Sequence, residues 1–242
     1  MYKNFSKVYD KFMEICDYNE WVQLLEGYIS EYNPQGKKVL DLGCGTGENL
    51  IRLSDKYECS GLDLSEDMLK RAKIKLKGRN VPLFLGDMRE FDTGEKYDIM
   101  FSFFDTVNHL TSLEDLADLF NSVRNSLNSN GIYIFDVVDR EFMDKMFPND
   151  IYADNRKDFA VIWEHFYDEE LNLDQIEATY FLKNKNRTFD KMTEYYEKRI
   201  FTHGEISACA KNAQLLLTKF EVNDRIAGKR LFYVLQNTEE SK

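Results

Sequence analysis

The stretch "VLDLGCGTGENL", residues 39–50, decides the fold of this chain. A hydrophobic run ends at the acidic residue Asp41 and leads into a glycine loop, after which the sequence turns helical; the three glycines are Gly43, Gly45 and Gly47. A strand, a glycine-rich turn and a helix place backbone N–H groups and the positive helix end at one point. Glycine is needed where φ is positive or a ligand approaches too closely for a Cβ atom. The stretch therefore predicts a site for an anionic or nucleotide-like ligand.

The glycine spacing separates two kinds of nucleotide site. The dinucleotide fingerprint is G-x-G-x-x-G, whereas this chain has G-x-G-x-G and carries Glu48 at the later position. Asp41 would repel a pyrophosphate but can position an ammonium group. The loop thus favours a nucleoside that carries an amino acid over NAD.

Between Val39 and Asp139, short β-prone runs alternate with helical stretches, which is typical of a parallel sheet covered by helices. Two further carboxylates end strands of this predicted sheet. Asp63 can accept hydrogen bonds from ribose hydroxyls, and Asp87 can accept from an exocyclic amine while Met88 packs on an adenine face. Because ligands bind at the carboxyl ends of the strands in such sheets, we expect these groups to meet.

The flanking segments differ from this α/β pattern. Residues 1–36 are expected to form an N-terminal helical cap, whose apolar face comprises Val8, Phe12, Ile15, Trp21, Leu24, Leu25 and Ile29. Residues 140–203 alternate in polarity and are rich in aromatics, which predicts an antiparallel β-rich lid insertion. A helix from Glu205 to Leu216 and two closing strands complete the core domain, which comprises residues 37–139 and 204–242.

The composition indicates a folded globular protein and argues against several kinds of partner. Of 242 residues 43% are hydrophobic, which is typical of a folded globular chain. The net charge of −11 argues against nucleic acid as a partner, because such binding needs clustered cations. The four cysteines lie far apart, so we expect reduced thiols and no metal site. Without a signal peptide or a long apolar run, we expect a cytoplasmic protein that does not bind membranes.

Residues 37–139 resemble the class I S-adenosylmethionine-dependent methyltransferases. VLDLGCGTG is similar to the first motif of that family, GLDLSEDML to the second, GDMREF to the third and YDIMFSFFDTVNHL to the fourth. FSKVYDKFM, YNEW and the late stretch EYYEKRIFTHGEISACAKNAQL resemble a subgroup that acts on small molecules. The resemblance implies a Rossmann-like seven-stranded sheet with an antiparallel last strand. It also implies S-adenosylmethionine as cofactor and S-adenosylhomocysteine as product.

The same resemblance implies roles for individual residues at the cofactor. The glycine loop would cradle its methionine part beside Asp41. Asp63 would hold the ribose, and Asp87 with Met88 would grip the adenine. The remaining contacts are expected from Leu64, Met68 and Phe104, with Tyr9 and Trp21 closing over the cofactor from the cap.

The exit of the fourth strand, FFDTVNHL, lies beside the transferred methyl group in that family, which makes Asp105, Asn108 and His109 candidate catalytic residues. His109 could act as a base or bind the acceptor; the alternative is that it caps the next helix or packs against the loop. For Asp105 the alternative is an ordinary loop hydrogen bond. Transfer from a sulfonium mainly needs alignment and exclusion of water, and a neutral amine needs no base.

The lid is expected to fold over the carboxyl edge of the sheet and to contact the acceptor through Tyr152, Trp163, His165, Tyr195 and Arg199. The alternative is that most of the lid aromatics form its own core. No N-P-P-Y or D-P-P-Y follows the fourth strand, unlike in enzymes that methylate adenine N6 or the glutamine amide. With the acidic charge, this favours N or O of a small molecule as acceptor, in a monomer or homodimer.

Three other functions stay open at this point. Asp63 would also suit a NAD-dependent oxidoreductase, although the glycine spacing weighs against it. A non-catalytic module could use a bound nucleoside to regulate a partner. A methyltransferase could also act on protein or RNA.

Overall fold

The computed structural model describes residues 5–238, which form two sheets. The main sheet has seven strands in the order β10-β11-β5-β4-β1-β2-β3. Their bounds are β1 Lys38–Leu42, β2 Glu58–Asp63, β3 Leu83–Leu85, β4 Tyr97–Ser102, β5 Leu127–Val137, β10 Leu216–Asn223 and β11 Arg230–Gln236. Strands β1 to β5 pair in parallel, whereas β11 is antiparallel to both of its neighbours. The predicted α/β fold with an antiparallel last strand is confirmed.

Helices cover both faces of this sheet because side chains alternate along its strands. Val39 points to one face and Leu40 to the other, each into a separate buried cluster. The first cluster lies under α2 (Tyr18–Tyr32), α3 (Glu48–Leu53) and α4 (Glu66–Lys75), and the second under α5 (Leu113–Ser126) and α7 (His203–Asn212). Because β1 to β5 are parallel, the loops that follow them meet at one edge of this three-layer core.

The predicted helix from Glu205 to Leu216 ends earlier, at Asn212. Gln214 takes a positive φ of 59°, which reverses the chain and lets β10 begin at Leu216. None of the helices in residues 5–238 is long and apolar enough to cross a membrane.

The N-terminal cap is helical, as predicted, but it is broken into pieces. Three short helices precede α2, namely η1 (Phe5–Lys7), α1 (Tyr9–Phe12) and η2 (Met13–Ile15). The helix α2 starts afresh because Asp17 accepts a hydrogen bond from Asn19 N at 2.9 Å. This restart changes the helical phase, and Ile15 is 84% exposed. Its prediction as part of the apolar face was wrong. Residues 1–4 of the predicted cap, like residues 239–242 of the predicted core domain, lie outside the described residues.

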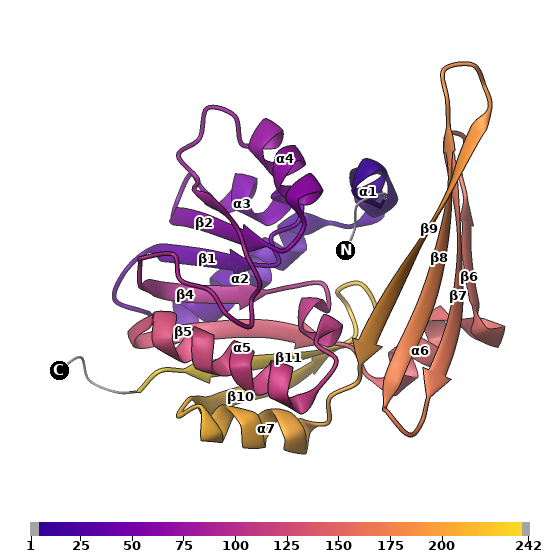
Figure 1. The fold of residues 1–242 in the computed structure, drawn as a ribbon. Helices are drawn as coiled ribbons and strands as arrows, with labels where there is room; N and C mark the ends of the chain where they lie inside the picture. Colours follow the sequence, from indigo (N-terminus) through magenta and orange to yellow (C-terminus); the bar gives the residue numbers. More distant parts are fainter. Residues whose placement is uncertain (1–4, 239–242) are drawn as a thin grey trace.

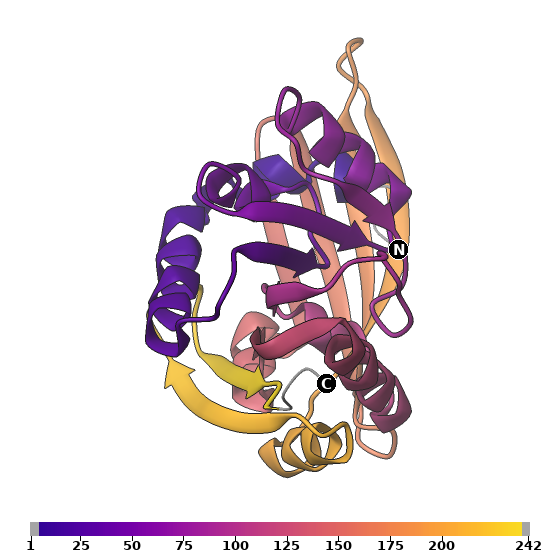
Figure 2. The same ribbon diagram turned by 90° about the vertical axis from the view of Figure 1, so that its left-hand side faces the viewer.

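The predicted β-rich insertion begins with a helix rather than a strand. Two helical segments, α6 (Arg140–Met146) and η4 (Pro148–Asp150), lead into a second, antiparallel sheet. Its strands in order are β6 (Ile151–Asn155), β7 (Phe159–Asp168), β8 (Leu173–Lys183) and β9 (Phe189–Arg199). We call this four-stranded sheet the lid. Figure 1 shows it standing at one end of the main sheet beside α1, and in Figure 2 its long strands lie behind the core.

Candidate active site

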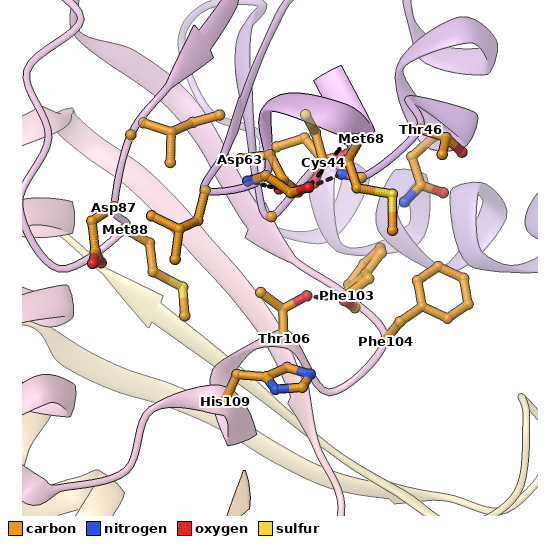
Figure 3. Close-up of a pocket in the computed structure, with 18 of the residues that line it drawn as sticks. Cys44, Thr46, Asp63, Met68, Asp87, Met88, Phe103, Phe104, Thr106 and His109 are labelled. Carbon is orange, nitrogen blue, oxygen red and sulfur yellow. Dashed lines mark hydrogen bonds between the residues drawn. The ribbon is translucent and has the colours of Figure 1, made fainter. Parts of the chain in front are cut away.

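A cavity opens at the carboxyl ends of β1 to β4, and we call it the strand-end cavity. Figure 3 shows Asp63 on one side with His109 opposite, Asp87 towards one end and Phe104 towards the other. The sequence-predicted residues that line it are Tyr9, Asp41, Gly43, Gly45, Asp63, Leu64, Met68, Asp87, Met88, Phe104 and His109. Parallel strands end at this edge, which brings together residues that are far apart in the chain.

All three glycines of the glycine loop take a positive φ, but they serve different contacts. A Cβ atom on Gly45 would meet nothing within 4 Å, so its backbone faces open space. A Cβ on Gly43 would meet Thr106 Cγ2 at 2.4 Å. A Cβ on Gly47 would meet Ala72 Cβ at 3.3 Å, and Gly47 does not line the cavity. Gly45 leaves room for a ligand, whereas Gly47 lets α4 pack closely.

Asp63 joins the end of β2 to the glycine loop. Its Oδ2 accepts from Gly45 N at 2.8 Å and its Oδ1 accepts from Ser65 N at 2.7 Å. Burial raises the pKa of Asp63, and the two backbone donors oppose that rise. Each carboxylate oxygen has a further lone pair, so Asp63 can still accept hydrogen bonds from a ligand.

Asp41 is a buried carboxylate that lines the cavity and is only 2% exposed. Its Oδ2 has no hydrogen-bond partner among residues 5–238. Burial, and then repulsion by Asp63, raises the pKa of Asp41 well above its usual value. An unpaired buried carboxylate is costly, so this position suits a ligand that brings a positive charge.

Asp87 is held at the far end of the cavity by a cation that the sequence interpretation missed. Arg89 Nη2 lies 2.6 Å from Asp87 Oδ2, and Arg89 Nη1 lies 2.6 Å from Asp115 Oδ1. The hydrogen bonds from Arg89 lower the pKa of Asp87. The stretch GDMREF contains Arg89 two residues after Asp87, but only the structure shows that it turns back onto the carboxylate.

Aromatic rings close the other end of the cavity. Phe104 takes a positive φ of 61° and packs on Trp21, with ring centroids 4.1 Å apart. Trp21 is 1% exposed and lies behind Phe104 rather than on the wall. Tyr18, which the sequence interpretation did not single out, lines the cavity with Tyr9 and packs 5.2 Å from Phe104.

A polar network fastens the cap onto the glycine loop. Thr46 Oγ1 donates to Asp10 Oδ1 at 2.6 Å, and Lys75 Nζ lies 3.0 Å from both Asp10 Oδ1 and Thr46 Oγ1. These contacts join α1 to α4 across the loop. They set Tyr9, the neighbour of Asp10, over the cavity.

His109 lies at the end of η3 (Thr106–His109) and faces the strand-end cavity. Burial, with a smaller contribution from the positive charge of Lys198, lowers the pKa of His109 to about 4. The imidazole is therefore neutral at physiological pH. A neutral imidazole can accept a proton or a hydrogen bond.

The other two candidates from this loop do not line the strand-end cavity. Asn108 is fully buried, where its Oδ1 accepts from Val138 N at 2.9 Å and its Nδ2 donates to Arg199 O at 2.7 Å. Asp105 is buried in contact with Lys198 and Arg230. Both side chains join the loop to other elements of the fold.

A second cavity, which we call the lid cavity, adjoins the first, since His109 and Thr111 line both. Tyr195 and Phe166 line it and are 73% and 61% exposed. The other walls carry three glutamates, and none of the described residues that line it is Lys or Arg; the glutamates are Glu164, Glu177 and Glu197. Alternation along β7, β8 and β9 had pointed to the aromatics, but not to this acidic row.

The remaining lid candidates are held by contacts within the protein. Tyr152 and Trp163 pack together, with ring centroids 5.3 Å apart, in the hydrophobic cluster between lid and cap. His165 lines the lid cavity, and its Nε2 lies 2.5 Å from the buried Asp174 Oδ1. Arg199 Nη2 pairs with Glu205 Oε1 at 3.1 Å. Among residues 5–238, no three or more His, Cys, Asp or Glu side chains gather to hold a metal ion.

Comparison with known proteins identifies the family. A family described as "Methyltransferase domain" matches residues 39–131. "Putative methyltransferase YqeM" of Bacillus subtilis (strain 168) is 31% identical over 99% of this chain and 98% of its own length. The chain belongs to the class I S-adenosylmethionine-dependent methyltransferases.

Other members of this family share its fold or part of its sequence. The crystal structure of an S-adenosylmethionine-dependent methyltransferase from Clostridium acetobutylicum ATCC 824 matches with a TM-score of 0.86 at 23% identity, covering 98% of this chain and 99% of the other. A dTDP-3-amino-3,4,6-trideoxy-alpha-D-glucopyranose N,N-dimethyltransferase of Streptomyces venezuelae is 31% identical over 49% of each chain. The first likeness concerns the whole fold.

The strand-end cavity fits the cofactor of this family on two observations. The unpaired Asp41 carboxylate suits the ammonium of its methionine part, and Gly45 leaves open space where a side chain would otherwise project. The acidic end of β2 with two free lone pairs suits a ribose.

Proposed function

We propose that this methyltransferase moves a methyl group to the nitrogen of a small amine. The observation that carries the proposal is the meeting of the strand-end cavity and the lid cavity at His109. The first cavity has the carboxylates and glycines that suit the donor, and the second has aromatic and acidic walls that suit an acceptor. Residues 1–36 would act as a cap, 37–139 and 204–242 as the donor domain, and 140–203 as the acceptor lid.

The residues of the chain would act mainly by binding and alignment. Bound S-adenosylmethionine supplies a methyl group activated by a sulfonium. Asp41 would hold the ammonium, Asp63 the ribose, and Asp87 with Met88 the adenine, while Leu64 and Met68 line the nucleoside. Tyr9 and Phe104 would exclude water and present aromatic faces to the positive charge. Neutral His109 would accept a proton or hydrogen bond from the acceptor.

The charge of the lid cavity favours a cationic acceptor. Glu164, Glu177 and Glu197 would attract an ammonium group, and Tyr195 and Phe166 would pack against its carbon skeleton. A diphosphate would be repelled by the same walls. Three relatives that match 49%, 43% and 41% of this chain are N,N-dimethyltransferases of dTDP-amino sugars, which supports nitrogen as the methylated atom. The acidic walls support an amine acceptor that, unlike a dTDP-amino sugar, carries no nucleotide.

Calorimetric titration with S-adenosylhomocysteine tests the donor half of the proposal. We expect Asp63→Ala to lower the affinity about 100-fold, because both the ligand contact and the support of the glycine loop are lost. Asp55→Ala, which removes an exposed carboxylate outside the cavity, should bind like the unmodified protein. Absence of binding by the folded unmodified protein would contradict the proposal.

A panel of labelled-methyl transfer reactions tests the acceptor half. The probes are spermidine, tyramine, glucosamine, a dTDP-amino sugar, bulk RNA and bulk protein. We expect transfer to an amine without a phosphate. Transfer to RNA or protein alone would assign the other acceptor class, and preference for the dTDP-amino sugar would refute the charge assignment of the lid cavity.

A further inference from the structure

The lid contacts the methyl-transfer end of the core through two consecutive residues of β9. His109 forms a hydrogen bond with the backbone of Glu197. The next residue, Lys198, directs its ammonium to Asp105 Oδ2. Because side chains alternate along a strand, Glu197 and Tyr195 can line the lid cavity while Lys198 points to the core.

Lys198 belongs to a buried cluster of four charges. Arg230 Nη1 contacts Asp105 Oδ1 and lies 3.0 Å from Asp136 Oδ2. The side chains of Lys198, Asp105, Arg230 and Asp136 are 12%, 10%, 7% and 0% exposed. Two cations balance two carboxylates, so the loss of one partner would leave a buried charge uncompensated. Of these four residues, Lys198 alone comes from the lid.

The cluster also holds an unusual turn at the exit of β4. Phe104 and Asp105 take positive φ values of 61° and 51°. Such backbone is strained for residues other than glycine and persists where its surroundings hold it. Here Asp105 N donates to Asp136 Oδ2 at 3.1 Å, and its carboxylate contacts both cations. The turn sets the direction of Phe104 on one cavity wall and leads into η3 with His109.

We infer that Lys198 is a positioning residue that anchors lid strand β9 to the β4 exit turn, so that the lid cavity and the strand-end cavity meet in register at His109. Lys198 touches neither cavity and acts through Asp105. Its effect on catalysis rests on the proposed function. Its effect on His109 does not.

The pKa of His109 can report on this anchor, because charged groups surround the imidazole. Lys198 lowers the pKa of His109 and Asp105 raises it, while burial gives the larger effect. Other ionisable groups line one cavity or the other with His109, among them Arg89 and Asp115 in the strand-end cavity and Glu164, His165, Glu177 and Glu197 in the lid cavity. The removal of the Lys198 charge leaves Asp105 facing His109 with less compensation, which favours the protonated imidazole.

The experiment uses the full chain with Lys198→Met, the conservative Lys198→Arg, and Lys191→Met as a control that removes an exposed lysine of the same strand. The double variant Lys198→Met with Asp105→Asn keeps the cluster balanced if the single variant folds poorly. The three imidazoles, His109, His165 and His203, are followed by NMR during pH titration. Hydrogen exchange of residues 104–110 and titration with S-adenosylhomocysteine complete the set.

We expect Lys198→Met to shift the titration of His109 upward by about one pH unit and to speed exchange in residues 104–110, with Lys198→Arg restoring both. The double variant should return the titration towards that of the unmodified protein. Affinity for S-adenosylhomocysteine should change less than about twofold, because the donor contacts are elsewhere. Lys198→Met behaving like Lys191→Met in both titration and exchange would overturn the inference. Failure of the unmodified protein to bind S-adenosylhomocysteine would refute the proposed function and leave the His109 result standing.

Discussion

The strand-end cavity and the lid cavity meet at His109, yet they are built in different ways. In the first, the carboxylates Asp41, Asp63 and Asp87 lie at or just beyond the carboxyl ends of neighbouring parallel strands. In the second, most of the wall residues come from β7, β8 and β9, and the antiparallel register of these strands decides which side chains lie next to each other. We infer from this contrast that the carboxylates of the donor side are specified locally, whereas the acceptor side depends on long-range strand pairing and on the anchor at Lys198.

If the glycine loop is rigid and locally specified, a single methyl group at Gly43 should disrupt it. Gly43→Ala combines a positive φ of 82° with a clash at 2.4 Å against Thr106. We expect a loss of about 3 kcal/mol in the free energy of unfolding, measured by chemical denaturation. Gly94→Ala shares the positive φ, at 70°, but meets nothing within 4 Å, so it should cost clearly less. Equal losses in the two variants would show that the close approach at Gly43 is unimportant.

His109, where the two cavities meet, should make the protein sensitive to acid. Burial lowers its pKa from 6.5 to about 4, so the unfolded chain binds the proton more tightly than the folded protein. Stability present at neutral pH is therefore lost as the pH falls from the unfolded towards the folded pKa. Between about pH 7 and about pH 5, the unmodified protein should lose about 2 kcal/mol in the free energy of unfolding through this group, and His109→Gln should not show that loss. Exposed His203→Gln is the control, and an unchanged acid profile in His109→Gln would contradict the assignment.

The buried carboxylate of Asp41 is expected to lower the stability of the ligand-free protein and to raise its affinity for the cofactor. Its raised pKa means that the ionised form destabilises the fold increasingly as the pH rises through that value. Asp41→Asn should therefore raise the Tm of the ligand-free protein at neutral pH, while affinity for S-adenosylhomocysteine falls about tenfold. Asp98→Asn is the contrast, because both Asp98 oxygens accept hydrogen bonds, from Lys38 N and Asn128 Nδ2 at 2.9 Å. It should lower the Tm and leave the affinity unchanged.

The smallest effect is expected in the lid. Glu164 and Glu177 lie directly opposite each other in the β7–β8 register, and like charges in such pairs are unfavourable. Glu177→Gln should raise the free energy of unfolding by about 0.5 kcal/mol. It should also weaken the binding of the acceptor that the transfer panel identifies, seen as a higher KM. Glu169→Gln, in the exposed turn before β8, should do neither. An unchanged acceptor KM in Glu177→Gln would show that the charge of Glu177 does not contribute to acceptor binding.

Much of the fold was predictable from local signals. Ser65 caps α4 by accepting a hydrogen bond from Met68 N at 3.3 Å, and serine followed by acidic residues is a local signal for a helix start. The strands that carry Asp41 and Asp63 near their carboxyl ends were predictable from the alternation of short β-prone runs with helical stretches. The exposed Ile15 and the early end at Asn212 were not, because single residues, Asp17 and Gln214, restart or reverse the chain there.

The class of fold, the cofactor family and eleven of the residues that line the strand-end cavity could be predicted from the sequence, because strand, turn and helix signals lie close to most of these residues in the chain. Three contacts became visible only in the folded chain: Arg89 turns back onto Asp87, Trp21 lies behind Phe104, and Lys198 joins a buried cluster with Asp105. The tertiary structure also decided which side chains of the lid share a cavity with His109. These contacts join residues from separate elements, and their geometry depends on packing and strand register rather than on local sequence.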